Sequence, residues 1–207
     1  MKRILLFCGM LLLTACASKI DNIKADKDTL SKIDEGYLLI GIETNRDLKA
    51  IYVDGPKSFI LTAQDIRSGS NYILANLPLG EYTISRINLN NYSYLDLDDE
   101  KEQWQFTLAA NKINYVGHLN ITTRGFWYTA SQIVLENKSS QAIEFVESNY
   151  PTILAGRSLN YGGPGEDLFF PFIEKTLTKQ EVKQWKNYSF YFSLFAPSML
   201  KYFPVKI

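Results

Sequence analysis

His118 is the only histidine in the chain, so it is the one side chain expected to titrate near neutral pH without a strongly shifted pKa. A Ser-His-Asp triad would have to include His118, and a metal site with two histidine ligands is impossible. Apolar side chains alternate with others along residues 113–121, and His118 falls on the face that also holds Val116 and Asn120. We therefore predict that His118 faces solvent from a strand rather than acting as a catalytic base.

Carboxylates are the other groups that could do chemistry. The densest cluster contains Asp96, Asp98, Asp99, Glu100 and Glu102. Oxygen-rich loops can bind calcium, but this cluster lacks the central glycine and the twelfth-position glutamate of an EF-hand loop. A solvated acidic loop is therefore the favoured interpretation of residues 96–102, and cation binding there is left open. Further acids could supply the two carboxylates of a glycoside hydrolase, although no spacing fixes their separation: Glu43, Asp47, Asp54 and Glu81.

The N-terminus has the three parts of a secretory signal. Lys2 and Arg3 precede an apolar run at residues 4–13, and small residues follow it. The apolar run is too short to cross a bilayer, which takes about 20 residues. The segment LTAC that ends at Cys16 closely resembles the lipobox of bacterial lipoproteins.

This resemblance implies that the signal, residues 1–15, is removed and that Cys16 becomes the first residue of the mature chain. The thiol of Cys16 would be joined to diacylglycerol and its amino group acylated, which anchors a protein to lipid without spanning the membrane. Ala17 and Ser18 resemble the residues that direct such lipoproteins to the outer membrane, with the periplasmic or surface face left open. Membrane lipid is thus the first expected partner.

The charge and cysteine content exclude several classes of function. The chain has 22 basic and 22 acidic residues, a balance that does not favour nucleic-acid binding. Removal of the signal takes away Cys8, and acylation of Cys16 would leave no free thiol for nucleophilic or redox chemistry. Two cysteines cannot form a cysteine-based zinc site. We therefore expect no metal and no cofactor.

Residues 16–35 are polar and charged and contain only isolated apolar side chains. These are Ile20, Ile23, Leu30 and Ile33. Segments of this composition between an acylated cysteine and a domain usually stay flexible. We predict that this segment is a tether that holds the domain off the lipid surface.

Residues 36–123 contain short apolar segments separated by turn-forming clusters, a pattern typical of an all-β domain. The expected strands cover residues 37–43, 49–53, 58–62, 71–75, 82–88, 103–108 and 113–121. These short strands predict a mainly β fold, specifically a seven-strand prealbumin-like or Ig-like β-sandwich.

One motif within this region is informative about the fold. The segment LPLGEYTI at 77–84 matches the L-P-x-G-x-Y-x-apolar pattern of prealbumin-like or carboxypeptidase-regulatory-like β-sandwiches. Pro78 presets φ for a turn, Gly80 can adopt a positive φ, and Tyr82 would enter the next strand with its hydroxyl bonded to the turn backbone. The resemblance covers residues 36–123, includes poorly characterised envelope lipoproteins, and implies a structural role without catalytic residues.

Residues 124–207 form the expected C-terminal α+β extension, packed on or beside the sandwich. A strand is expected up to Leu135, a helix at 140–149 that ends before Pro151, and a second helix after the capping box Thr178-x-x-Glu181.

Aromatic residues are denser in the extension than in the rest of the chain. Most are expected to fill a core, but a surplus left exposed would mark a docking surface for an envelope protein. Tyr161, Phe170 and Tyr202 are the candidate positions for this surface.

Together these features predict a non-catalytic lipoprotein of the bacterial envelope that acts as a binding or structural module. The alternative is a periplasmic hydrolase or a carbohydrate-binding accessory domain of an enzyme. That alternative needs polar groups with shifted pKa values gathered in one pocket.

Overall fold

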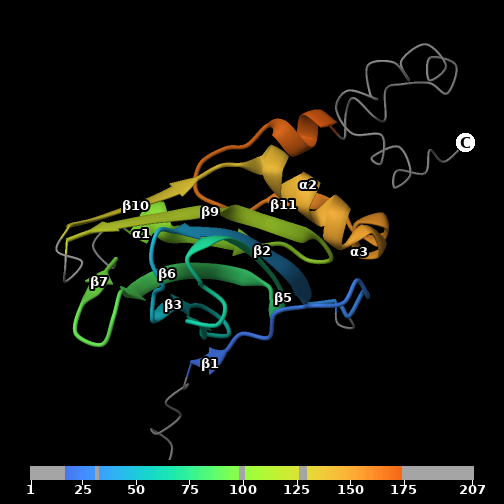
Figure 1. The fold of residues 1–207 in the computed structure, drawn as a ribbon. Coiled ribbons are helices and arrows are strands. Elements are labelled where there is room, and N and C mark those ends of the chain that lie inside the picture. Colours follow the sequence, from blue (N-terminus) through green and yellow to red (C-terminus); the bar gives the residue numbers. More distant parts are fainter. Residues whose placement is uncertain (1–16, 31–32, 98–100, 126–129, 174–207) are drawn as a thin grey trace, which may run out of the picture.

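The computed structural model describes residues 17–30, 33–97, 101–125 and 130–173, and these residues form a mainly β fold with two mixed sheets (Figure 1). The first sheet has the strand order β1 (Ser18–Lys19), β4 (Phe59–Thr62), β3 (Ala50–Asp54), β6 (Gly80–Asn88) and β7 (Tyr94–Asp96), and β8 (Gln105–Leu108) also pairs with β6. The second sheet has the order β10 (Ala130–Glu136), β9 (Ile113–Arg124), β2 (Glu35–Thr44) and β5 (Gly69–Pro78), and β11 (Leu159–Tyr161) also pairs with β9.

The prediction of a mainly β fold is confirmed. Each of the seven expected strands is present, as β2 to β6, β8 and β9. Four further strands, β1, β7, β10 and β11, extend the sheets within the described residues, and a short helix α1 (Lys101–Trp104) precedes β8.

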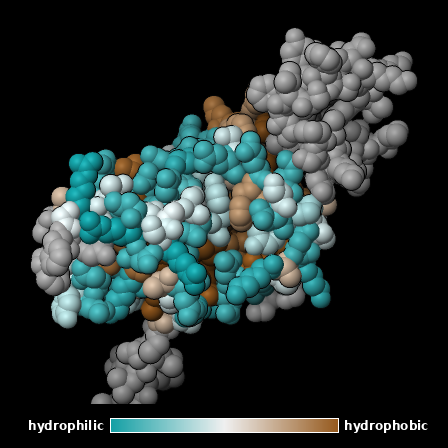
Figure 2. Space-filling model, in the orientation of Figure 1, coloured by the Kyte–Doolittle hydropathy of each residue, from teal (hydrophilic) through white to brown (hydrophobic). Residues whose placement is uncertain are grey.

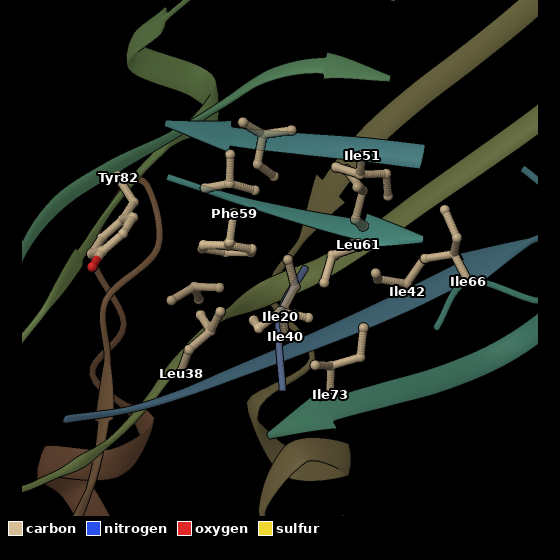
Figure 3. Close-up of a cluster of buried hydrophobic side chains, with 14 of the residues drawn as sticks. Ile20, Leu38, Ile40, Ile42, Ile51, Phe59, Leu61, Ile66, Ile73 and Tyr82 are labelled. Carbon is tan, nitrogen blue, oxygen red and sulfur yellow. The ribbon is translucent and has the colours of Figure 1, made fainter. Parts of the chain in front are cut away.

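The main hydrophobic core lies between the two sheets. In Figure 3, Leu38, Ile40 and Ile42 from β2 face Phe59 and Leu61 from β4, and all five are at most 1% exposed. Burial alternates along β4 and β8, as expected for strands with one buried face.

A second core lies on the outer face of the second sheet. There α2 (Ser139–Asn149) and α3 (Pro151–Gly156) cover Tyr37 and Leu39 of β2 and Tyr115 of β9 (Figure 1). The middle strand β2 is therefore buried on both faces, which explains why its sequence is a nearly continuous apolar run. The described residues thus form three layers, two of sheet and one of helix.

A bulge in β9 changes which side chains face the helices. Tyr115 pairs with Leu39, and His118 pairs with Gly41. Two residues of β9 therefore lie between these pairs opposite one residue of β2, and the second of the two is Gly117, whose φ is +117°. Before the bulge, Tyr115 faces the helical layer, and after it Leu119 belongs to the core between the sheets. The prediction that residues 113–121 keep one apolar face throughout is therefore wrong.

The prediction that His118 faces solvent is also wrong. His118 is only 1% exposed, because the outer face of the sheet is covered at this position. Its ring makes an edge contact with Tyr72, which in turn stacks on Phe145 of α2 at a centroid distance of 4.4 Å. Alternation within one strand does not reveal that a helix covers the second face.

Residues 17–30, which we call the strap, do not form the expected tether. Ser18–Lys19 pairs with β4 at the edge of the first sheet, and Ile20 lies in the main core at 4% exposure (Figure 3). The Ile23 N–H donates to the Leu74 carbonyl at 2.7 Å, on the edge strand β5 of the second sheet. The strap thus crosses from the edge of one sheet to the edge of the other.

The strap continues to the helical layer. The Asp26 carboxylate accepts the Thr152 and Ile153 N–H groups at the start of α3, at 2.7 and 3.1 Å. Asp28 forms an ion pair with Arg157 at 2.7 Å and accepts the Tyr37 hydroxyl at 2.8 Å. The strap therefore connects all three layers.

The described residues after Thr123 pack on the second sheet as part of the same fold. The expected boundary between residues 123 and 124 falls inside β9, and β10 pairs with β9 along its whole length. The expected helix at 140–149 is confirmed as α2, whereas the helix expected after Thr178 lies outside the described residues. No helix in the described part of the chain is long and apolar enough to cross a membrane.

Candidate functional site

Cys16 lies just outside the described residues, and β1 begins only two residues later at Ser18. The surface next to β1 therefore lies closest to the expected lipid anchor. This surface contains a groove with a volume of about 630 Å³.

We call this groove the anchor groove. It lies between the strap and the connection from β4 to β5. Its charged lining residues are Lys19, Asp21, Lys24, Asp65 and Arg67. Asp65 is engaged within its own turn, since its carboxylate accepts the Thr62 N–H and hydroxyl at 2.9 and 2.8 Å. The remaining lining is mostly polar, in keeping with the hydrophilic side chains that cover most of the face in Figure 2.

A smaller groove of about 220 Å³ lies on the other side of the strap and adds Lys57 to the surroundings of β1. Around β1, basic side chains thus outnumber acidic ones by four to two. The whole chain has 22 basic and 22 acidic residues, so this surface is more basic than the protein as a whole. Sequence reasoning missed it because the strap was expected to stand away from the domain.

The turn motif connects the two sheets. Pro78 ends β5 in the second sheet and Gly80 begins β6 in the first, with Gly80 at a φ of +133°. Tyr82 is fully buried, and its hydroxyl donates to the Pro78 carbonyl at 2.9 Å. Its ring stacks on Phe106 of β8 at 5.6 Å. Tyr82 therefore fixes this connection by a hydrogen bond and by packing.

Substitutions in this turn should lower the free energy of unfolding by different amounts. We expect Tyr82→Phe to cost about 0.5–1.5 kcal/mol, since it removes one net hydrogen bond and keeps the ring. Gly80→Val should cost more, because a β-branched residue tolerates positive φ poorly and its Cβ would lie 2.7 Å from the Pro56 side chain. Urea unfolding measures both, with Tyr94→Phe, at an exposed tyrosine, as the matched control. Equal midpoints for Tyr82→Phe and Tyr94→Phe would contradict the proposed role of the hydroxyl.

His118 is the centre of the only histidine environment in the chain. Neither of its ring nitrogens has a hydrogen-bond partner. Nε2 lies 3.6 Å from Glu43 Oε2, while Lys138 Nζ lies 3.2 Å from Glu43 and 3.0 Å from Glu136. Burial lowers the pKa of His118, the positive charge of Lys138 lowers it further, and Glu43 and Glu136 only partly oppose this effect. The neutral imidazole is therefore the favoured form, enclosed beneath a surface network of one lysine and two glutamates.

This arrangement gives His118 a packing role among the described residues. A catalytic base must come within about 3 Å of the substrate proton, directly or through one water, whereas the His118 side chain is almost entirely buried. Its neighbours include the edge of the Tyr72 ring, the Glu43 carboxylate and Gly41, where an added Cβ would overlap the imidazole ring.

Three of the acids considered for a glycoside hydrolase each have a different partner. Glu43 is paired with Lys138, Glu81 accepts the Gln105 amide at 3.2 Å, and Asp47 accepts the Ser68 N–H at 2.8 Å. In the acidic loop, Asp96 forms an ion pair with Arg86 at 3.6 Å, and residues 98–100 lie outside the described residues. Over the described ranges, no group of three or more histidine, cysteine or acidic side chains is placed to hold a metal ion.

The candidate partner surface is not assembled as expected. Phe170 is 6% exposed and packs in the second core, so its assignment to an exposed surface is wrong. Tyr161 is half-buried against the same core, and its hydroxyl donates to the Pro164 carbonyl at 3.1 Å. Tyr202 lies outside the described residues. Among the described aromatic residues of the extension, most pack in or against the second core, namely Phe145, Tyr150, Tyr161, Phe169 and Phe170, whereas Phe172 is exposed.

Comparisons with known proteins place the chain in no group. No protein-family model matches it, and the search of curated proteins found no match.

Proposed function

We propose that the chain is an envelope lipoprotein, held on the outer membrane by an acylated Cys16, whose folded body is a non-catalytic binding or structural module. The observation that carries this proposal is the LTAC segment at residues 13–16, which is placed directly before the first strand. Under this proposal, cleavage before Cys16 removes only residues that precede the strap.

The finer description of the fold belongs to the same proposal. We infer a prealbumin-like sandwich formed by β2 to β6, β8 and β9, to which the remaining strands and the helical layer are added. Its support is the corner at residues 78–82, where a buried tyrosine fixes the chain as it passes from one sheet to the other.

Replacing Cys16 tests the proposal directly. We expect Cys16→Ala to abolish incorporation of a fatty-acid analogue and to leave a soluble or unprocessed protein, because the thiol that would carry the lipid is absent. Cys8→Ala is the matched control, since Cys8 would leave with the signal. Metabolic labelling and detergent partition measure both variants. Equal labelling of wild type and Cys16→Ala would refute the acyl anchor.

A further inference from the structure

The strap leaves almost no spacer between the proposed anchor and the folded body. Two residues of extended chain span at most about 7 Å. Residues 18–20 are already fixed, since the Ser18 N–H donates to Ser58 O at 3.3 Å and the Ile20 N–H donates to Ile60 O at 3.2 Å. An acyl anchor on Cys16 would therefore hold the β1 edge at the level of the lipid headgroups.

The charged side chains near this edge suit that position. Lys19, Lys24 and Arg67 line the anchor groove, and Lys57 lines the smaller groove beside it. We call these four residues the anchor-side surface. Lys19 is partly engaged, since its Nζ donates to Gln64 at 2.8 Å. Of the two acids nearby, Asp65 is held by Thr62, as described above.

Phospholipid headgroups offer phosphate oxygens, which lysine and arginine bind as hydrogen-bond donors of opposite charge. Screening limits such attraction to about 8 Å at physiological ionic strength, so it requires that the basic side chains lie close to the lipid. The short connection to Cys16 provides this proximity for the anchor-side surface.

We propose that the anchor-side surface docks on the phospholipid headgroups, so that the body lies on the membrane with the β1 edge toward it. This inference rests on the proposed acylation of Cys16. It also orients the molecule: β1 and α2 lie on opposite sides of the body, so α2 faces away from the lipid (Figure 1).

Photo-cross-linking of the full-length chain in living cells tests the orientation. A photoreactive residue replaces Gln64, which lines the anchor groove, or in a matched control variant Gln141, which is exposed on α2. After irradiation, lipid adducts and incorporation of a fatty-acid analogue are measured on the same protein. We expect several-fold more phospholipid adducts from position 64 than from position 141.

Two further variants separate docking from anchoring. An insertion of about ten Gly and Ser residues between Ala17 and Ser18 adds a flexible spacer of about 18 Å, which should reduce the adducts at position 64 several-fold. The charge reversals Lys24→Glu and Arg67→Glu, made together, should do the same while fatty-acid incorporation stays unchanged.

The outcomes are distinct. Equal adducts from positions 64 and 141, or adducts insensitive to the spacer and the charge reversal in a chain that is still acylated, would overturn the docking surface and leave the lipoprotein proposal intact. A wild-type chain that incorporates no fatty acid would overturn both.

Discussion

Gly117→Ala is expected to lower the free energy of unfolding by about 2–6 kcal/mol. Two costs combine at this position. A φ of +117° is a backbone conformation that alanine adopts only with strain, about 1–3 kcal/mol. The new Cβ would also lie 2.8 Å from the Leu135 side chain and 3.4 Å from the Glu136 carbonyl, and overpacking of this kind costs about 1–3 kcal/mol.

Gly69→Ala is the matched control for Gly117→Ala. Gly69 has a similar φ of +108°, but a Cβ there meets no atom within 4 Å. Only the backbone strain should then remain, about 1–3 kcal/mol. Urea unfolding followed by tryptophan fluorescence gives both values. If both substitutions lower the free energy of unfolding by the same amount, the contact between the bulge and β10 does not contribute, and β10 shifts to make room for the new methyl group.

The second large effect is a loss of stability as the pH falls from 7 to 5. The folded state lowers the pKa of His118 below the unfolded value of about 6.5, so in this range the unfolded chain binds more protons. Protonation of His118 then favours the unfolded state, and the free energy of unfolding should fall by up to about 1.4 kcal/mol per pH unit. Tyr72 contacts the edge of the His118 ring, and the charged groups that act on it are Lys138, Glu43 and Glu136.

His118→Leu should remove this pH dependence. Leucine suits the apolar surroundings, and no hydrogen bond is lost because neither ring nitrogen has a partner. At pH 8, where the imidazole is neutral in both states, the difference between wild type and variant reports packing alone. The acids of the strap should not add to this loss of stability between pH 7 and 5. Burial raises the pKa of Asp26 and Asp28, but their hydrogen bonds lower it more, so that both pKa values lie below 3.8. The stability that these two carboxylates provide is therefore lost only in stronger acid. Parallel stability curves for wild type and His118→Leu between pH 7 and 5 would contradict this account of His118.

The strands could be predicted from the sequence because each depends on local alternation and on turn residues. The seven expected strands and the helix α2 were predicted within a few residues. The turn at Gly80 was predictable for the same reason, since proline, glycine and tyrosine at fixed spacing act within a few residues of one another.

Features that depend on distant segments were not predictable in this way. The burial of His118 requires α2, and the switch of faces in β9 requires one inserted residue whose only local sign is Gly117. The strap gave a weak signal in Ile20, Ile23 and Leu30, all of which pack against a core, whereas Ile33 is 93% exposed. Isolated apolar residues in a polar segment do not indicate which surface they cover.

The strap and the parallel pairing of β2 with β9 also bear on how quickly the chain can reach this fold. The Tyr150 hydroxyl donates to the Ile23 carbonyl, and the Asp28 carboxylate pairs with Arg157, so the ends of a loop longer than a hundred residues must meet. Contacts of such high sequence separation slow folding, because the entropy of closing the loop is lost before the contacts form. The strap is therefore expected to pack stably on the edges of β4 and β5 only after the segments around Tyr150 and Arg157 have been made and packed. Under the proposed export and acylation of Cys16, this delay would keep the chain open during its passage across the membrane, and the segment next to the anchor would close the structure last.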